Sequence, residues 1–155
     1  MNEISVRKAT KDDLDALLEF EQGIVSNERP FDETLKEGEI HYYDLAEMIT
    51  APHITVVVAE LGNEIIGSGY ARIEIAKPYQ KHSDYAYLGC MYVKPEYRGK
   101  GVNNRVLEGL KEWCRERGIH ELRLEVYTDN TPAVKAYEKA GFKPLLTWMR
   151  LGLDE

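Results

Sequence analysis

Apolar and polar residues along the chain follow two spacings, and each spacing predicts a different kind of element. Ile4–Arg7 alternates between apolar and polar, which is typical of a strand with one buried face. Two longer β-rich runs, Ile54–Glu60 and Glu64–Ile75, lie on either side of the short Leu61-Gly62-Asn63 turn. This arrangement predicts a β-hairpin in the middle of the chain.

Further runs predict strands in the second half of the chain. Tyr85–Val93 is followed closely by a proline, and Leu122–Tyr127 lies between two helical segments. We expect residues 142–151 to supply one or two closing strands.

Helical spacing of apolar residues predicts four helices. Capping residues mark their ends: Thr10 suits the start of the first, and Gly118 and Gly141 follow the third and the fourth. The expected helices are one that begins after Thr10, then Ile40–Ile49, Val102–Arg117 and Pro132–Ala140. Residues 27–38 are rich in Asn, Pro, Asp and Gly, and we expect a loop or a broken helix there.

The order in which these strands and helices follow one another along the chain predicts an α/β fold. The early strands follow one another closely and should pair antiparallel. Tyr85–Val93, the next helix and Leu122–Tyr127 form a strand-helix-strand unit, which gives a parallel pair with a right-handed crossover. A chain of 155 residues suits a single domain over residues 1–155.

Composition and charge exclude several classes of protein. The formal net charge is −7, with 20 basic and 27 acidic residues, which argues against a general nucleic-acid binder. The longest apolar stretch, Ile54–Ala59, is too short to span a membrane, and the first residues lack the layout of a secretory signal. Cys90 and Cys114 cannot build a disulfide framework. We therefore expect a soluble, cytoplasmic protein with no membrane or nucleic-acid partner.

The acidic residues are concentrated in one stretch. Glu28 to Glu47 holds seven acidic and two basic residues, so it carries −5 of the −7 net charge. One interpretation is a solvated helix face with a loop. The other is a rim that attracts a cationic small molecule.

A glycine-rich turn between a predicted strand and a predicted helix is the clearest candidate site. Arg98-Gly99-Lys100-Gly101 separates Val93 from the helix that begins at Val102. The glycines let the backbone turn tightly, and the unpaired N–H groups of a helix start attract anions. The alternative is an ordinary strand-to-helix turn with solvated basic residues. The chain has no Cys-x-x-Cys, and its four histidines lack metal-ligand spacing, so we expect no metal site.

Two segments resemble signatures of the GNAT superfamily of N-acetyltransferases. Arg98-Gly99-Lys100-Gly101-Val102-Asn103 resembles its R/Q-x-x-G-x-G/A loop, and Asn130–Phe142 resembles its N-x-x-A-x-x-x-Y-x-x-x-G-F segment. The surrounding order of elements is similar from Ile4 to the end of the chain. Asn103 departs from the final Gly or Ala of the signature, so its side chain should point away from the phosphates, or the loop should adjust.

The resemblance implies a fold and a co-substrate. The expected fold is a mixed, mainly antiparallel sheet of six to seven strands with about four helices, splayed between strands 4 and 5. The expected co-substrate is acetyl-CoA, with its pyrophosphate in the glycine-rich loop and its pantetheine arm hydrogen-bonded by Asn130. The backbone of Met91–Val93, where the sheet splays, matches the strand that supplies the oxyanion donors in the family. The residues that this implies for binding acetyl-CoA are Met91, Tyr92, Val93, Arg98, Gly99, Lys100, Gly101, Val102, Asn103, Asn104 and Asn130.

The resemblance also implies a catalytic acid, and the chemistry calls for a base. A thiol has a pKa of about 8.5, so the departing thiolate needs a proton, and Tyr137 matches the general-acid tyrosine of the family. The alternative for Tyr137 is packing on an amphipathic helix. Glu125 is the candidate base that deprotonates the amine, and an ion pair with Arg123 or another neighbour is its alternative role. We interpret Cys90 as a small apolar strand residue rather than a nucleophile.

The sequence therefore predicts an acetyl-CoA-dependent N-acetyltransferase that works by direct transfer in a ternary complex. The acidic stretch, together with Tyr42 and Tyr43, favours a small cationic amine as the acceptor. A peptide N-terminus or a lysine side chain is the alternative acceptor, and a non-catalytic acyl-CoA-binding sensor is the alternative class. The sequence leaves open which amine is acetylated, the acyl-chain length and whether the chain forms a homodimer.

Overall fold

The structure of the chain, a computed structural model, describes residues 3–154. Its strands are β1 (Ile4–Lys8), β2 (Ile54–Leu61), β3 (Glu64–Ile75), β4 (Asp84–Val93) and β5 (Leu122–Leu124). Its α-helices are α1 (Leu14–Glu28), α2 (Leu45–Thr50), α3 (Val102–Glu116) and α4 (Thr131–Lys139), and short 3-10 turns lie at Lys11–Asp13, Arg29–Phe31 and Pro95–Tyr97. The chain divides into two compact units, of which the first ends at Glu125 and the second begins at Val126.

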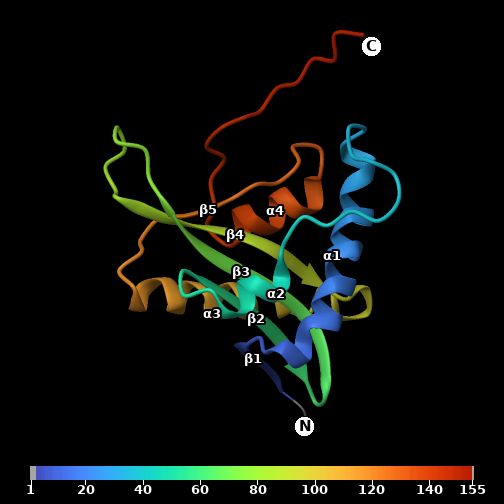
Figure 1. The fold of residues 1–155 in the computed structure, drawn as a ribbon, viewed down its shortest axis with the longest axis vertical. Coiled ribbons are helices and arrows are strands. Elements are labelled where there is room, and N and C mark those ends of the chain that lie inside the picture. The colour runs from blue at the N-terminus through green and yellow to red at the C-terminus, as the bar shows by residue number, and fades with distance from the viewer. Residues whose placement is uncertain (1–2, 155) are drawn as a thin grey trace. The chain divides into compact units, whose positions relative to one another are not determined.

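The five strands form one mixed sheet in the order β1-β2-β3-β4-β5 (Figure 1). The pairs β1·β2, β2·β3 and β3·β4 are antiparallel, and β4·β5 is parallel. The predicted fold class, the hairpin and the parallel strand-helix-strand unit are confirmed. The predicted count of six to seven strands is too high, because residues 142–151 form no strand in the described chain. A strand needs a hydrogen-bonded neighbour, and Pro144 at the start of this segment has no N–H to donate.

Helices cover both faces of the sheet. On one face, two glycines of β3 leave room for α3: a Cβ on Gly69 would lie 2.7 Å from Val106, and one on Gly67 would lie 3.1 Å from Val102. On the other face, residues of α1 and α2 pack with β2 and with the buried Tyr70 of β3. α1 and α3 therefore lie on opposite sides of β3 and β4 (Figure 1).

One helix prediction is confirmed and another needs correction. α1 runs to Glu28 and a 3-10 turn follows it at Arg29–Phe31, which agrees with the broken helix that was one of the two expectations for residues 27–38. The expected helix Ile40–Ile49 forms only as α2, Leu45–Thr50. The residues before it stay extended because the buried Glu21 of α1 accepts the backbone N–H groups of Tyr42 and Tyr43.

The second unit contains α4. Asn130 caps the helix through a 3.4 Å hydrogen bond from the Ala133 N–H to its side-chain oxygen. Gly141 ends the helix with a positive φ of 103°, as the sequence predicts for a helix end. Among residues 3–154, no helix has the length and apolar content to cross a membrane, and no cluster of three or more His, Cys, Asp or Glu side chains could hold a metal ion.

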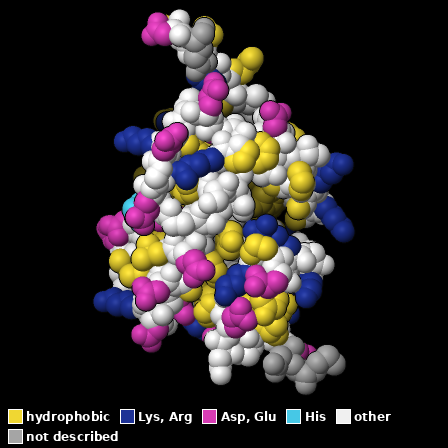
Figure 2. Space-filling model, turned by 90° about the vertical axis from the view of Figure 1, so that its right-hand side faces the viewer, with side chains coloured by type: hydrophobic (Ala, Val, Ile, Leu, Met, Phe, Trp, Pro, Cys, Tyr) yellow, Lys and Arg dark blue, Asp and Glu magenta, His cyan; other side chains and the backbone are white. Residues whose placement is uncertain are grey.

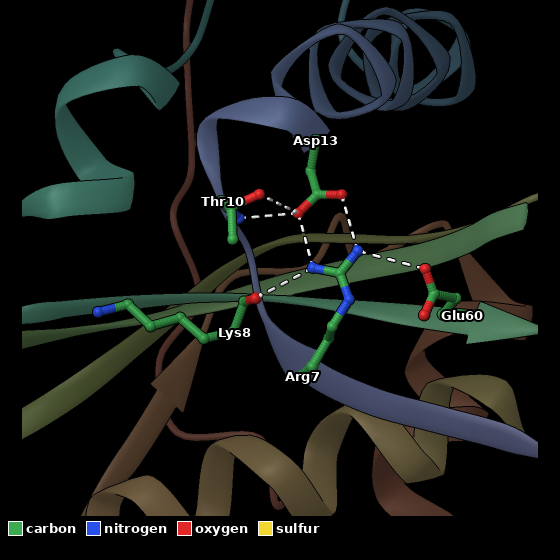
Figure 3. A network of polar contacts seen from close by, with 5 residues as sticks. All are labelled: Arg7, Lys8, Thr10, Asp13 and Glu60. Atoms are coloured by element: carbon green, nitrogen blue, oxygen red, sulfur yellow. Dashed lines mark hydrogen bonds and ion pairs between the residues drawn. The ribbon is translucent and has the colours of Figure 1, made fainter. Parts of the chain in front are cut away.

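An ion-pair network ties β1 to the start of the first helix and to β2 (Figure 3). The Arg7 guanidinium donates two hydrogen bonds to Asp13, at 2.8 and 2.9 Å, and a third to Glu60 at 3.3 Å. Asp13 also accepts the Thr10 N–H at 2.8 Å, which makes Thr10 the N-cap that the sequence predicts. The hydrogen bonds from Arg7 hold the pKa of Asp13 below its ordinary value.

Asp13→Asn should lower the free energy of unfolding by about 1–3 kcal/mol at pH 7, because a buried charge-assisted hydrogen-bond network loses its anion. A carboxyl whose pKa is lowered by folding adds stability above its unfolded pKa of about 3.9, and that stability is lost as pH falls through the folded pKa. The difference from the wild-type chain should therefore shrink below about pH 4. Urea unfolding across pH 2.5–7 measures it, with the exposed Asp12→Asn as control. Equal effects of the two variants at pH 7 would contradict the prediction.

Candidate functional site

The sheet opens between β4 and β5. Only three residue pairs join these strands, from Ala86 with Leu122 to Leu88 with Leu124, and β4 then continues alone on that side to Val93 within the first unit. The Lys94 N–H donates to Ile66 of β3, so by alternation the backbone groups of Val93 face the open edge. The predicted acetyl-CoA-binding residues Met91, Tyr92 and Val93 all lie on this unpaired stretch.

A β-bulge bends β4 where the opening begins. Ser68 of β3 pairs with Tyr92 and Tyr70 pairs with Gly89, so Gly69 alone lies opposite Cys90 and Met91. Cys90 has a φ of 50°, the only positive φ outside glycine among the described residues. Such a left-handed conformation costs an L residue about 1–2 kcal/mol, so the surroundings must hold it in place.

Side chains from two other segments form hydrogen bonds with the backbone N–H and carbonyl groups of Cys90. The Ser68 hydroxyl donates to the Cys90 carbonyl oxygen at 2.7 Å, and the Cys90 N–H donates to the Tyr43 hydroxyl oxygen at 3.3 Å. The thiol itself is buried, and burial raises its pKa to about 12. A thiol with that pKa is almost wholly protonated at neutral pH, which favours the interpretation of Cys90 as a structural residue.

The glycine-rich loop, Arg98–Gly101, follows the open edge of β4 after the short 3-10 turn Pro95–Tyr97. Gly99 and Gly101 have φ values of 77° and 82°, and a Cβ on either would meet no atom within 4 Å. Gly101 is the N-cap of α3, and the first helical hydrogen bond runs from the Arg105 N–H to the Gly101 oxygen. The N–H groups of Val102, Asn103 and Asn104 therefore have no partner in their own helix, which is the anion-attracting arrangement that the sequence predicts.

Arg98 and Lys100 lie at the loop, whereas the Val102 side chain belongs to the core. Arg98 donates through Nε to the Val93 carbonyl oxygen at 2.9 Å, and its guanidinium lies 5.4 Å from the Tyr92 ring centre. Lys100 lies 5.6 Å from the ring centre of Tyr97 and is exposed. The Val102 side chain is buried, so only its backbone N–H is available to a ligand.

A row of tyrosines lies on the α1 face of the sheet. We call Tyr42, Tyr43, Tyr70 and Tyr87 the tyrosine row, because successive ring centres lie 5.7, 5.4 and 6.4 Å apart. Arg72 lies over the rings of Tyr70 and Tyr87 and is paired with Glu74. The row joins the segment before α2 to β3 and β4.

Two carboxylates lie near the tyrosine row. Burial raises the pKa of Glu28. The contact with Tyr42 lowers this pKa, whereas the charges of Asp32 and Glu125 raise it. The Tyr42 hydroxyl is buried, although no hydrogen bond of standard geometry joins it to a described residue. Burial and the charge of Glu125 also raise the pKa of Tyr87. Nothing in the sequence distinguishes Glu28 from the other acids of its stretch, so its place near the tyrosine row could not be predicted.

Contrary to the sequence prediction, Glu125 does not lie within a strand. β5 ends at Leu124, so Glu125 follows the strand instead of lying within it, and its side chain is exposed. Arg123 forms its ion pair with Glu121 at 3.1 Å, not with Glu125. The predicted role of Glu125 as the base stays a prediction, and so does its alternative role in an ion pair.

Tyr137 and Asn130 belong to the second unit. The Tyr137 ring lies edge-on to Phe142 with ring centres 5.8 Å apart, and Asn130 caps α4. Their predicted roles toward acetyl-CoA stay predictions.

The acidic stretch is partly used by local structure. Asp44 caps α2, and Glu39 pairs with His41 at 3.4 Å. On the face shown in Figure 2, acidic side chains are scattered among hydrophobic and uncharged ones, without a single continuous acidic patch.

The sequence model of the acetyltransferase (GNAT) family matches residues 17–142 of this chain. The chain belongs to that family. The match includes the open edge of β4, the glycine-rich loop, Glu28, Glu125 and α4.

Similar proteins agree with this assignment. The thialysine N-epsilon-acetyltransferase of Sus scrofa is 37% identical over 59 residues, which are 38% of this chain and 35% of that protein. The streptothricin acetyltransferase of Escherichia coli is 33% identical over 84 residues, which are 54% of this chain and 44% of that protein. This chain thus spans less than half the length of both relatives.

A solved structure shows the same fold. The crystal structure of a predicted acetyltransferase with acetyl-CoA, from Clostridium acetobutylicum, has a TM-score of 0.70 and 24% sequence identity over 97% of each chain. At 24% identity, the similarity is evidence for a shared fold only.

Proposed function

We propose that the protein transfers the acetyl group of acetyl-CoA to the primary amine of a small cationic acceptor, by direct transfer in a ternary complex. One observation carries this proposal: the open edge of β4 is followed, after one 3-10 turn, by an exposed glycine loop at the start of a 15-residue helix. The 2.9 Å bond from Arg98 to Val93 joins the two features. A strand edge can pair with the amides of a pantetheine arm, and a helix start can take the pyrophosphate next to it.

The residues of the loop suit a pyrophosphate. The N–H groups of Val102, Asn103 and Asn104 supply donors, and Gly99 and Gly101 leave the space beside the backbone empty. Lys100 and Arg98 add positive charge to a chain whose net charge is −7. The side chain of Asn103 is then expected to turn away from the phosphates.

The reaction needs few groups. The neutral amine attacks the thioester carbonyl carbon and the carbonyl oxygen becomes an oxyanion. The C–S bond then breaks to give CoA thiolate and an N-protonated amide, which becomes the neutral amide when its extra N–H proton passes to solvent. Backbone N–H groups of Met91–Val93 that face the open edge would stabilise the oxyanion. Tyr137 would give its proton to the thiolate, and Glu125 would take the proton from the incoming ammonium.

The tyrosine row supports a cationic acceptor. Arg72 already lies over the rings of Tyr70 and Tyr87, so the Tyr42 end of the row is the part that could attract a cation. The charges of Glu28 and Glu125 act on this row. Two relatives are named for thialysine and streptothricin as their substrates. A peptide or a lysine side chain of a protein is the competing acceptor.

Thiol release from acetyl-CoA tests the function directly. We expect turnover with polyamines, aminoglycosides or basic amino acids, and less with neutral amines at equal concentration. A preference for peptides would replace the proposed acceptor and leave the reaction intact. Tight binding of acetyl-CoA without turnover on any amine would instead indicate a non-catalytic acyl-CoA sensor.

Gly101→Asp should raise the Kd for acetyl-CoA at least about 100-fold, because it puts a carboxylate where the pyrophosphate would lie. Gly101→Asn is the matched control: it has the same shape without the charge, and Asn tolerates a positive φ. We expect a much smaller loss of affinity for it. Calorimetry with acetyl-CoA measures both, and similar Kd values for the two variants would contradict an anion site at this loop.

Tyr137→Phe should lower kcat by about 10²–10⁴-fold and leave the Kd for acetyl-CoA nearly unchanged, because it removes only the proton donor. The loss should be smaller above the pKa of the thiol, where the thiolate leaves without a proton. Steady-state turnover over pH 6.5–9.5 measures this effect. An unchanged kcat at every pH would assign Tyr137 to packing against Phe142 alone.

Glu28→Gln should raise the KM of a cationic acceptor about 10-fold and leave the KM of acetyl-CoA unchanged, because one carboxylate near the tyrosine row is lost. Since burial raises the pKa of Glu28, binding of the acceptor should weaken as pH falls through that value, and the variant should lose this limb of the pH profile. Asp15→Asn, at the other end of α1, removes the same charge and serves as control. Equal KM values for the two variants would place the acceptor elsewhere.

A further inference from the structure

A fully buried carboxylate lies in α1, and the proposed reaction does not use it. Glu21 has no exposed side-chain surface. One of its oxygens lies 2.8 Å from His41 Nδ1, and the other accepts the N–H groups of Tyr42 at 2.8 Å and Tyr43 at 2.9 Å. A buried carboxylate is costly unless its oxygens are satisfied, and here three donors from one short segment satisfy it.

The partners of Glu21 all lie in the segment before α2, so its carboxylate fixes the position of that segment. His41, Tyr42 and Tyr43 are consecutive residues of the extended segment before α2. Two backbone N–H groups on one oxygen fix the path of that segment against α1, and so fix where the Tyr43 side chain starts. Glu21 therefore determines the position of Tyr43.

Tyr43 extends from this anchor to the bulge in β4. Its ring lies edge-on to the buried Tyr70, with ring centres 5.4 Å apart, and its hydroxyl oxygen accepts the Cys90 N–H at 3.3 Å. Burial raises the pKa of Tyr43, so the hydroxyl stays neutral across the physiological range. The contact joins residues 47 apart in the sequence.

The bond from Cys90 to Tyr43 is needed because of the backbone at Cys90. A left-handed L residue relaxes to a regular strand unless its surroundings hold it, and the Cys90 N–H would be buried without a partner if the Tyr43 hydroxyl were lost. Ser68 holds the carbonyl side of the same residue at 2.7 Å. Tyr43 and Ser68 thus bind the N–H and the carbonyl group of Cys90, respectively.

We propose that Tyr43, anchored by Glu21, is a positioning residue that holds the Cys90 bulge and thereby aims the backbone N–H groups of Met91–Val93 at the thioester carbonyl. The inference rests on the proposed acetyl transfer. The segment that carries Tyr42 of the tyrosine row is thereby tied, through Tyr43, to the strand that holds the donor.

Tyr43→Phe tests the proposal with acetyl-CoA as donor and the best amine of the panel as acceptor. Removing one hydroxyl should lower kcat about 10–100-fold and change the Kd for acetyl-CoA less than 3-fold, because the loop still holds the pyrophosphate. Tyr79→Phe, an exposed tyrosine on the β3–β4 connection, is the control and should match the wild-type chain.

A rescue variant separates positioning from general packing. Glycine adopts a positive φ without strain, so Cys90→Gly should hold the bulge when the Tyr43 hydroxyl is missing. The double variant Tyr43→Phe/Cys90→Gly should then recover at least about 5-fold in kcat over Tyr43→Phe alone. A kcat for Tyr43→Phe equal to that of Tyr79→Phe, or a loss that Cys90→Gly leaves unchanged, would overturn the proposal.

Amide hydrogen exchange decides the structural part without relying on turnover. Exchange of the Cys90 amide should be at least about 10-fold faster in Tyr43→Phe than in the wild-type chain, and unchanged in Tyr79→Phe. Glu21→Ala should give the same faster exchange, together with a lower Tm. If the wild-type chain turns over no amine, the proposed function is wrong. If exchange at the Cys90 amide is unchanged in Tyr43→Phe, the proposed role of Tyr43 is wrong.

Discussion

The left-handed backbone at Cys90 is the constraint on which the candidate site depends. A regular β4 would continue its pairing, whereas the bulge places two residues opposite Gly69 and bends the strand where β5 leaves it. That conformation is unfavourable for cysteine, and it persists because Ser68 and Tyr43 bind both of its backbone groups. The bulge beside the open edge is therefore held by contacts from two other elements.

Glycines set how closely the helices approach this strand. Gly67 and Gly69 let α3 lie on β3, and Gly23 lets the backbone of α1 approach the Tyr92 ring, where a Cβ would come within 2.6 Å. Larger side chains would push both helices outward. Close packing therefore keeps the start of α3, and with it the glycine-rich loop, next to the end of β4.

Electrostatics divides the site into two regions of opposite character. The loop offers backbone N–H groups with Arg98 and Lys100, which suits an anion. The tyrosine row offers aromatic rings with Glu28 and Glu125, which suits a cation. An acyl donor that carries phosphates and a positively charged amine could thus bind the same small unit without competing for the same charges.

The sequence by itself determined the order of the elements, the hairpin around Gly62, the glycine-rich loop with its helix start, and the second motif from Asn130 to Phe142. These features follow from local rules: alternation, helical spacing, capping, and the positive φ that glycine allows. The tertiary structure alone decided the length of α2, the bulge at Cys90 and the place of Glu28 beside the tyrosine row. Each depends on partners distant in sequence, such as Glu21 with Tyr43 at 22 residues and Tyr43 with Cys90 at 47. A local pattern cannot show which distant side chain will satisfy a buried backbone group, because that choice is made only when the packed elements bring the two together.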